Sequence, residues 1–591
     1  MIFRFRHSRA GGNLAKIFWV PAFAGMTVLG ACTTTPRPVA QGPVEVQILA
    51  INDFHGNLEP PKAAIEATAP DGSAVKVPAG GAAYLTTAAK AWREGKQYSV
   101  TVSAGDMIGA APLVSALFLD EPTIGAMDLA GVEYNAVGNH EFDKGSAELL
   151  RMQNGGCAKL TSRTPCAIEP FKGAGFKFLA ANVLTASGVT LFPGTAIKDF
   201  GPVQVGFIGM TLKETATIVS PAGVAGITFA DEAATANAAI PALKAAGADA
   251  IVLLIHQGGR TTGGYNDKSC PNLDGDIMPI LAKLDPAIDV VVSGHTHTAY
   301  ICELPRAGGR PLLLTSAGRY GTLITDIRLA IDPVRGVYAH RANNIIVQGE
   351  PFVGSAGHVP LQPAFTTYTK DAISGALVDR YAAAAAPVAA RVVGRLSAPL
   401  TREQSPSREI NAGDFIADAQ LAATRGLGAQ IAFTNSGGVR ADLVPAAGGS
   451  ITYGQLFAMQ PFGNNLVVKT LTGAQLKALL EQQFASGTNT VARPNMLLPS
   501  KGFAFAYDLS RAAGERIVEL TLDSKPIDPA VRYRVTVVNF LSSGGDNFTM
   551  LAQGTDAVDA GLDVDASEAY LKAGAEIPVM GRIRDLTPKQ P

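Results

Sequence analysis

The sequence predicts an α/β domain followed by an α+β domain. With 591 residues, the chain is too long for one hydrophobic core, so two large domains are expected. From about residue 45, short apolar runs alternate with alanine-rich stretches of helical character, which is the pattern of an α/β layered fold. Beyond about residue 390, helix and strand signals mix without regular strand–helix–strand spacing, which favours α+β.

Apolar runs in the first region have the length and composition of buried strands. We expect strands over 44–51, 98–105, 176–183, 203–210, 249–257 and 288–295. Helix-like stretches, such as 231–247, lie between several of them. Polar residues follow the ends of several strands, and loops at the carboxyl ends of strands are where open α/β sheets build their sites. The sequence therefore predicts a functional site at this edge.

The N-terminus resembles an export signal. Residues 1–16 are basic, and the apolar stretch 17–31 is short and ends in small residues. The sequence "LGAC" ends at Cys32 and resembles the lipobox of bacterial lipoproteins, which predicts a signal peptide over 1–32 and lipidation of Cys32. An ordinary signal peptide with a free cysteine is the alternative. Residues 33–44 are expected to form a flexible tether.

Charge and cysteine content narrow the class of protein further. The formal net charge of -1 argues against a general binder of nucleic-acid polymers. Apart from Cys32, four of the 5 cysteines remain, and in an exported protein this favours disulfides. Pairing of sequence neighbours, Cys157 with Cys166 and Cys270 with Cys302, is the simplest of three connectivities. A cysteine-ligated zinc site is the rival, but no Cys-x-x-Cys spacing occurs.

Residues of metal-binding type are concentrated after the predicted strands. Five of the 8 histidines lie in "NDFHG", "GNHEFD", "LIHQGG" and "GHTH", and none follows His358. Nitrogen and carboxylate ligands suit Zn, Mn or Fe, and a carboxylate can bridge two ions. Two metals sharing a carboxylate would clamp the attacking and leaving oxygens of a displacement at phosphorus. The candidate ligands are Asp53, His55, Asp106, Asn139, His256, His295 and His297.

The ordered motifs resemble those of a known family. "INDFHG", "SAGD", "GNHEFD", "LIHQGG" and "VSGHTH" are similar to the motif set of the calcineurin-like metallophosphoesterases. "TNSGGVR", "ITYGQLFAMQPFGNNLV" and "NFLSSGGDNF" resemble the C-terminal domain of bacterial 5′-nucleotidases and UDP-sugar hydrolases. The resemblance implies a four-layer α/β/β/α metallophosphoesterase domain, a helical linker that acts as a hinge, and an α+β nucleotide-binding domain. The expected boundaries are 45–355, 356–390 and 391–588.

The resemblance also implies how two divalent metal ions, Zn, Mn or similar, would be held. Asp106 would bridge them. His140 would stabilise charge that develops on the phosphate, and Asp143 would hold the His140 ring. Glu141 is expected to be a structural hydrogen-bonding residue. One metal would be held by Asp53, His55, Asp106 and His297, and the other by Asp106, Asn139, His256 and His295.

Residues of the second domain would bind the substrate. By resemblance, Phe462 and Phe540 would sandwich the base, and Asn464 and Asp546 would contact base and ribose, although Asp546 could instead close a turn. An arginine suits phosphate because its guanidinium donates two parallel hydrogen bonds. The spacing of Arg402 and Arg408 departs from the family pattern, and each of them could instead be a solvated charge on the surface. The arginine candidates are Arg402, Arg408 and Arg440.

The resemblance implies a metal-dependent phosphohydrolase that converts 5′-nucleotides to nucleoside and phosphate by attack of a hydroxide bound to both metals. UDP-sugars, nucleoside di- and triphosphates and 2′,3′-cyclic nucleotides are further substrates that it allows. Two alternatives are a sulfur-oxidation hydrolase with the same metals and a catalytically silent nucleotide-binding lipoprotein. We expect a monomer in the periplasm or cell envelope, anchored only by its lipid. By analogy with the lipoproteins of enteric bacteria, Thr33 after Cys32, rather than an aspartate, favours the outer membrane over the inner.

Overall fold

The computed structural model describes residues 42–161, 163–306, 310–354 and 357–588. The expected signal peptide, lipidation at Cys32 and residues 33–41 of the expected tether lie outside the described residues. In the part of the chain that the structure describes, no helix is both long and apolar enough to cross a lipid bilayer.

The first sheet of the N-terminal region has six strands in the order β16-β15-β1-β4-β5-β6. β1, β4, β5 and β6 are parallel, whereas β15 and β16 join the sheet antiparallel. Parallel strands present their carboxyl ends along one edge of the sheet. The strands are β1 Val44–Ile51, β4 Ser99–Ser103, β5 Val132–Ala136, β6 Lys177–Leu179, β15 Leu323–Asp332 and β16 Gly336–Ile346.

The second sheet also has six strands, in the order β13-β14-β12-β11-β9-β8. Its central strands β9, β11, β12 and β14 are parallel, and β8 and β13 are antiparallel edges. The strands are β8 Thr195–Asp199, β9 Gln204–Thr211, β11 Ala250–His256, β12 Val290–Ser293, β13 Ala299–Leu304 and β14 Leu312–Ala317.

All six runs predicted as strands contain a strand, and one of them is interrupted. The run 176–183 was expected to be continuous, but β6 ends at Leu179 and β7 (Val183–Thr185) begins after a break. The Asn182 side chain donates hydrogen bonds to the carbonyls of Thr211 (2.5 Å) and Ala230 (3.0 Å). These hydrogen bonds anchor the chain between the two strands. The apolar composition of 176–183 gives no indication of them.

The two sheets pack face to face. Ile48, Val102, Phe207 and Val252 are fully buried in the core that the sheets share. The neighbour of Ile48, Leu49, belongs to a different core, because successive side chains of a strand point to opposite faces of the sheet.

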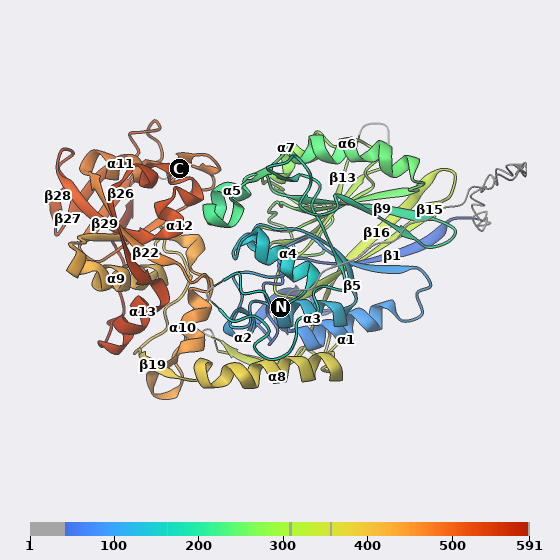
Figure 1. Cartoon of the computed structure of the whole chain (residues 1–591), viewed down its shortest axis with the longest axis horizontal. Coiled ribbons are helices and arrows are strands. Elements are labelled where there is room, and N and C mark those ends of the chain that lie inside the picture. The colour runs from blue at the N-terminus through green and yellow to red at the C-terminus, as the bar shows by residue number, and fades with distance from the viewer. Residues whose placement is uncertain (1–41, 162, 307–309, 355–356, 589–591) are drawn as a thin grey trace, which may run out of the picture. The chain divides into compact units, whose positions relative to one another are not determined.

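Helices cover both outer faces, so the domain has the four-layer α/β/β/α arrangement that the resemblance implies (Figure 1). On the first sheet, α1, α3 and α8 share a core with β1, and Tyr381 of α8 makes an edge contact with Phe118 at 5.0 Å between ring centroids. On the second sheet, α6 and α7 share a core with β9 and β11. The helices are α1 Ala82–Arg93, α3 Glu121–Ala130, α6 Glu232–Ala245, α7 Ile277–Leu281 and α8 Ala372–Ala389.

The C-terminal region is α+β, as predicted. A five-stranded sheet has the order β25-β20-β29-β22-β30, and a four-stranded sheet has the order β28-β27-β26-β31. Residues of both sheets and of α11 (Gly473–Glu481) form one hydrophobic core. The strands are β20 Ile431–Asn435, β22 Asn465–Thr472, β25 Leu497–Pro499, β26 Phe503–Tyr507, β27 Ile517–Leu522, β28 Lys525–Pro526, β29 Arg532–Val538, β30 Thr555–Leu562 and β31 Ile583–Asp585, and the other principal helices are α9 Asn411–Thr424, α10 Tyr453–Met459 and α13 Asp563–Lys572.

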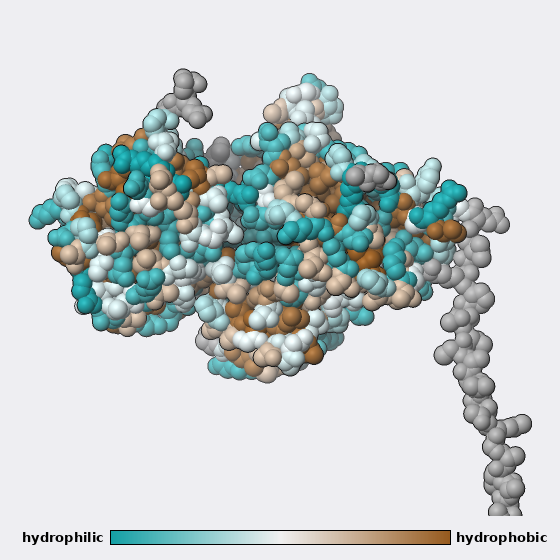
Figure 2. Space-filling view, turned by 90° about the horizontal axis from the view of Figure 1, so that it is seen from above, coloured by the Kyte–Doolittle hydropathy of each residue, from teal (hydrophilic) through white to brown (hydrophobic). Residues whose placement is uncertain are grey.

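The expected disulfides are present, and they have the simplest of the three connectivities, Cys157–Cys166 and Cys270–Cys302, each with its Cα atoms 5.5 Å apart. The first closes a short loop after α4 (Ser146–Asn154), and the second ties the loop after β11 to β13. The face of the molecule in Figure 2 carries small hydrophobic patches set among broader hydrophilic areas. This mixture is normal for a surface exposed to water.

Candidate metal centre and substrate site

Every predicted metal ligand lies at or just beyond the carboxyl end of a strand. The strands concerned are β1, β4 and β5 of the first sheet and β11 and β12 of the second. Five of the seven residues have a left-handed backbone, which is uncommon for residues other than glycine and concentrates at functional sites. They are Asp53 (φ 49°), His55 (47°), Asp106 (51°), His295 (68°) and His297 (59°).

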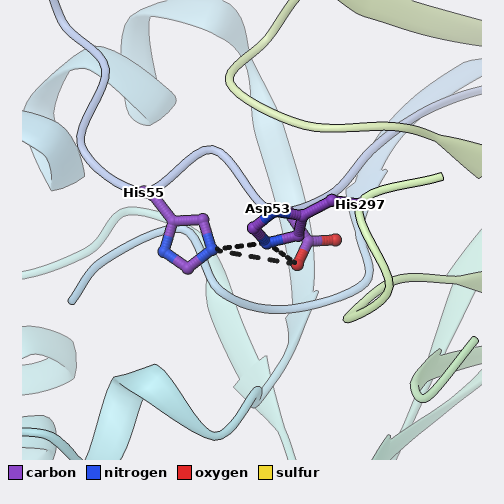
Figure 3. A group of neighbouring side chains, drawn as sticks. All are labelled: Asp53, His55 and His297. Carbon is purple, nitrogen blue, oxygen red and sulfur yellow. Dashed lines mark hydrogen bonds and ion pairs between the residues drawn. The ribbon is translucent and has the colours of Figure 1, made fainter. Parts of the chain in front are cut away.

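The first group of donors comprises Asp53, His55 and His297 (Figure 3). The two histidine Nε2 atoms lie 3.1 Å apart, and Asp53 Oδ1 lies 3.3 Å from Nε2 of His297 and 3.9 Å from Nε2 of His55. The other ring nitrogen of His55, Nδ1, donates to the carbonyl of Gly109 at 3.0 Å, so its Nε2 presents a lone pair to the group. Two histidine nitrogens this close together beside a buried carboxylate fit a shared cation.

The second group comprises Asp106, His256 and His295, with Asn139 beside them. His256 Nε2 lies 3.0 Å from Asp106 Oδ2, while its Nδ1 donates to the Ala104 carbonyl at 2.7 Å. Asn139 Oδ1 lies 3.2 Å from His256 Nε2 and 3.1 Å from His295 Nδ1. Burial alone would lower the pKa of His256, but the Asp106 carboxylate outweighs it and raises the pKa to about 10. This carboxylate therefore strongly favours a positive charge in the group.

Asp106 connects the two groups through one oxygen. Its Oδ2 lies 3.0 Å from Nε2 of His256 and 3.6 Å from Nε2 of His55. Its Oδ1 instead accepts the backbone N–H of His140 at 2.9 Å. The carboxylate is thus held by the backbone on one side and faces both donor groups on the other, which is the geometry that a bridging ligand needs.

His140 and Asp143 form the pair that the resemblance implies. Nδ1 of His140 lies 2.9 Å from Asp143 Oδ2, and the His140 ring centroid is 5.1 Å from that of His55. Burial alone would lower the pKa of His140, but the Asp143 carboxylate outweighs it and raises the pKa. Asp143 therefore favours the protonated imidazole, a donor to developing negative charge.

Glu141 has the structural role expected of it. Its carboxylate accepts three backbone N–H groups, from Asp106 (2.9 Å), Met107 (2.9 Å) and Gly138 (2.7 Å). It thereby joins the loop after β4 to the loop after β5, which carry Asp106 and Asn139.

Phe462 lies directly beside the candidate centre. Its ring stacks on that of His140 with 5.9 Å between centroids and 25° between planes, and the Arg440 guanidinium lies 5.8 Å from the Phe462 centroid. Phe540 is half-buried and packs against Gly545, where an added Cβ would lie 2.3 Å from its ring. Among the described residues no ring contact joins Phe462 to Phe540. The base sandwich therefore stays a prediction.

The two polar residues predicted to contact base and ribose are held by neighbours. Asp546 has a left-handed backbone (φ 55°) and accepts a hydrogen bond from the Asn435 side chain at 2.6 Å. The carbonyl of Asn464 accepts the backbone N–H of Asp563 at 2.9 Å. Asp546 lies in a short 3₁₀ turn, so both of its predicted roles, as a ribose contact and as a turn residue, remain compatible with its position.

Two of the three predicted arginines are brought together. The guanidinium of Arg402 donates to the backbone carbonyl of Arg440 at 2.9 Å. Arg408 lies elsewhere, because the turn between Ser405 and Glu409 directs it to the hydroxyl of the buried Tyr507. The structure therefore does not place Arg408 with the other two.

Arg319 is a further cation near the centre that sequence reasoning missed. Its guanidinium lies 4.9 Å from the ring of Tyr320, and that ring is 5.8 Å from the His297 ring. Burial, followed by the charges of Arg440 and Arg319, holds the pKa of His297 well below its usual value. Arg319 follows the carboxyl end of β14, a strand parallel to β12, so its place after that strand was the signal that could have identified it.

Comparisons with known proteins agree with this architecture. Residues 46–299 match the family model of calcineurin-like phosphoesterases, and residues 392–553 match the C-terminal domain of 5′-nucleotidases. The crystal structure of a 5′-nucleotidase precursor from Thermus thermophilus superimposes with a TM-score of 0.73 at 28% identity, covering 92% of this chain and 99% of that one.

Relatives in sequence include proteins longer than this chain. A cell wall protein of Listeria monocytogenes is 30% identical over 585 residues, which are 93% of this chain and 70% of that protein. An endonuclease of Bacillus subtilis is 29% identical over 533 residues, which are 90% of this chain but only 40% of that protein.

Proposed function

The chain belongs to the 5′-nucleotidase family, which joins a calcineurin-like phosphoesterase domain to a 5′-nucleotidase C-terminal domain, and we propose that it hydrolyses 5′-nucleotides to nucleoside and phosphate. It is a hydrolase of phosphoric ester bonds. The observation that supports the reaction best is the convergence of two groups of nitrogen and oxygen donors on one carboxylate, that of Asp106.

The residues of the candidate centre would have different roles in the reaction. Calcineurin-like phosphoesterases use two metal ions, which supply a water of lowered pKa and stabilise the attacking and leaving oxygens. The two donor groups joined by Asp106 would hold these ions. His140, kept protonated by Asp143, would donate a hydrogen bond to the phosphate as charge develops on it. Arg440 and Arg402 would neutralise the remaining phosphate charge.

The second domain would supply nucleotide selectivity. We propose that the base stacks on Phe462 and Phe540, because stacking uses the ring face and tolerates every base. Asn464 and Asp546 would contact base and ribose. UDP-sugars, nucleoside di- and triphosphates and 2′,3′-cyclic nucleotides are further candidate substrates. We propose that the linker 356–390 is a hinge that lets the substrate domain move relative to the metal centre.

The place of action is also a proposal. We propose an exported protein in the cell envelope, anchored through a lipid on Cys32 and acting as a monomer. The N-terminal sequence supports export, and the Listeria relative is named a cell wall protein. Labelling of cells with a radioactive fatty acid would test the anchor, because Cys32→Ala should abolish the label.

Metal dependence should be complete. Protein comprising residues 33–591 is treated with EDTA and assayed for phosphate release from 5′-AMP before and after addition of Mn or Zn. We expect less than about 1% of the activity after chelation and its recovery with metal, because the lowered pKa of bound water is lost with the ions. Full activity after chelation would contradict the two-metal mechanism. No release from folded, metal-loaded protein would contradict the 5′-nucleotide assignment and favour a sulfur or other ester.

Arg319 should contribute to substrate binding. We expect Arg319→Ala to raise KM for 5′-AMP about tenfold, because a hydrogen bond to a charged group contributes about 1.5 kcal/mol. The metal content should not change. The matched control is Arg335→Ala, which removes an exposed arginine from the same domain. An unchanged KM would exclude Arg319 from the phosphate site.

A further inference from the structure

Asp120 is a buried carboxylate behind the metal centre that the mechanism does not use. It lies at the start of α3, its side chain has no exposed surface, and its backbone is left-handed (φ 64°). That conformation is uncommon in residues other than glycine, although aspartate and asparagine adopt it more readily than most. Asp120 makes no side-chain capping bond to its own helix. Its contacts lie instead with the chain on either side of the candidate centre.

The contacts of Asp120 tie two separate segments together. Oδ1 accepts the hydroxyl of Ser115 at 2.7 Å. Oδ2 accepts the backbone N–H of Gly109 at 3.2 Å and the ammonium of Lys144 at 2.5 Å. Gly109 belongs to the loop after β4, and Lys144 directly follows Asp143. One carboxylate oxygen therefore holds both segments.

The loop after β4 contacts both His55, a candidate metal ligand, and Asp143 of the His140–Asp143 pair through one peptide group. The carbonyl of Gly109 accepts the Nδ1–H of His55 at 3.0 Å, and so sets the ring so that Nε2 faces the metal position. The N–H of the same peptide group, from Ala110, donates to Asp143 Oδ2 at 3.1 Å. The Gly109–Ala110 peptide group thus lies between His55 and Asp143.

We propose that Asp120 and Lys144 form a positioning pair that fixes the Gly109–Ala110 peptide group, and through it both His55 and the His140–Asp143 pair. Neither residue contacts the reacting atoms. The effect that this pair has on metal binding does not depend on which substrate the protein hydrolyses. Its effect on turnover rests on the proposed function.

The pair must be removed as a unit to test this idea. Burial alone would raise the pKa of Asp120, but Lys144 outweighs it and keeps the pKa below its usual value, so the carboxylate is ionised. Removing one charge would leave the other buried without its partner, which strongly destabilises a folded protein. The double variant Asp120→Gly, Lys144→Met removes both charges together with the acceptor of the Gly109 N–H, and glycine adopts the left-handed backbone without strain.

The experiment compares this double variant and Lys144→Met with the wild type, each loaded with Co²⁺. We expect the double variant to melt within a few degrees of the wild type. We also expect its affinity for Co²⁺ to fall about 10–100-fold and its visible absorption spectrum to change, because an outer partner of a metal-bound histidine has effects of that size. Its kcat for 5′-AMP should fall by a similar factor, with KM changed less than about threefold. Lys144→Met alone should show the same spectral change together with a lower melting temperature, because it leaves the Asp120 carboxylate without its cation.

A matched control separates positioning from folding. Asp326 and Arg328 of β15 form another buried ion pair of the same domain, 2.9 Å apart, without contacts to the candidate ligands. Asp326→Asn with Arg328→Gln should leave the Co²⁺ spectrum and affinity unchanged. The proposal is overturned if the Asp120 and Lys144 variants have wild-type spectra and affinities. It is equally overturned if the control pair changes both to the same extent.

Discussion

Replacement of Asp106 by Asn is expected to lower kcat for 5′-AMP by about 1000-fold or more and to reduce the number of bound metal ions. Only Oδ2 of Asp106 faces both donor groups, at 3.0 Å from His256 and 3.6 Å from His55. A neutral amide donates its oxygen to a cation less strongly and cannot balance the charge of two ions. Because a catalytic metal contributes several kcal/mol to the transition state, its loss corresponds to about three decades in rate.

The fold should survive this substitution. Oδ1 of Asp106 accepts the His140 N–H, and an asparagine oxygen can accept the same bond. The measurement is the metal content of the dialysed protein, by plasma mass spectrometry, together with kcat. The control is Asp199→Asn, which removes an exposed carboxylate from β8. Two tightly bound ions with near wild-type kcat in the Asp106 variant would show that Asp106 is not the bridge.

The structure brings the residues predicted as metal ligands together, and the sequence could indicate this because they follow strand ends. The apolar runs identify β1, β4, β11 and β12, and the parallel arrangement brings the residues after them to one edge. The order of the motifs, rather than any single histidine, carried that prediction. The break after Leu179 was missed because Asn182 has partners that are distant in sequence.

The arginines show where sequence reasoning fails. Arg402 reaches Arg440 because Leu400 pairs with Leu443, which lies 43 residues further along the chain. The turn at Ser405 instead directs Arg408 away from them. Spacing along the chain does not distinguish these two outcomes. Arg319 required knowing that β14 lies beside β12 in the second sheet. Such placements depend on tertiary pairing and leave no local pattern.

Asp120 could not have been identified from the sequence for a related reason. An aspartate before a helix predicts an N-cap, in which the side chain accepts an N–H of the first helical turn. The Asp120 carboxylate instead binds Ser115, Gly109 and Lys144. Gly109 and Lys144 lie in two separate loops that the folded chain brings together at this carboxylate, so the role of Asp120 follows from the structure alone.

His140→Asn is expected to lower kcat about 100–1000-fold while both metal ions stay bound, because it removes one donor to the charge that develops in the transition state. The His140 side chain bonds to Asp143 and is outside both donor groups, so the metal ligands keep their partners. KM should change far less than kcat, because the donor acts mainly in the transition state.

The measurement is kcat and KM for 5′-AMP with metal content determined on the same sample. The control is His358→Asn, an exposed histidine of β18 (Gly357–Val359) far along the chain from the motifs. If the His140→Asn variant lost a metal ion together with its activity, His140 would be a metal ligand rather than a hydrogen-bond donor to the phosphate. Unchanged kcat in metal-replete protein would exclude His140 from the reaction, and Asp143 would then lose its proposed role of holding the protonated His140 ring.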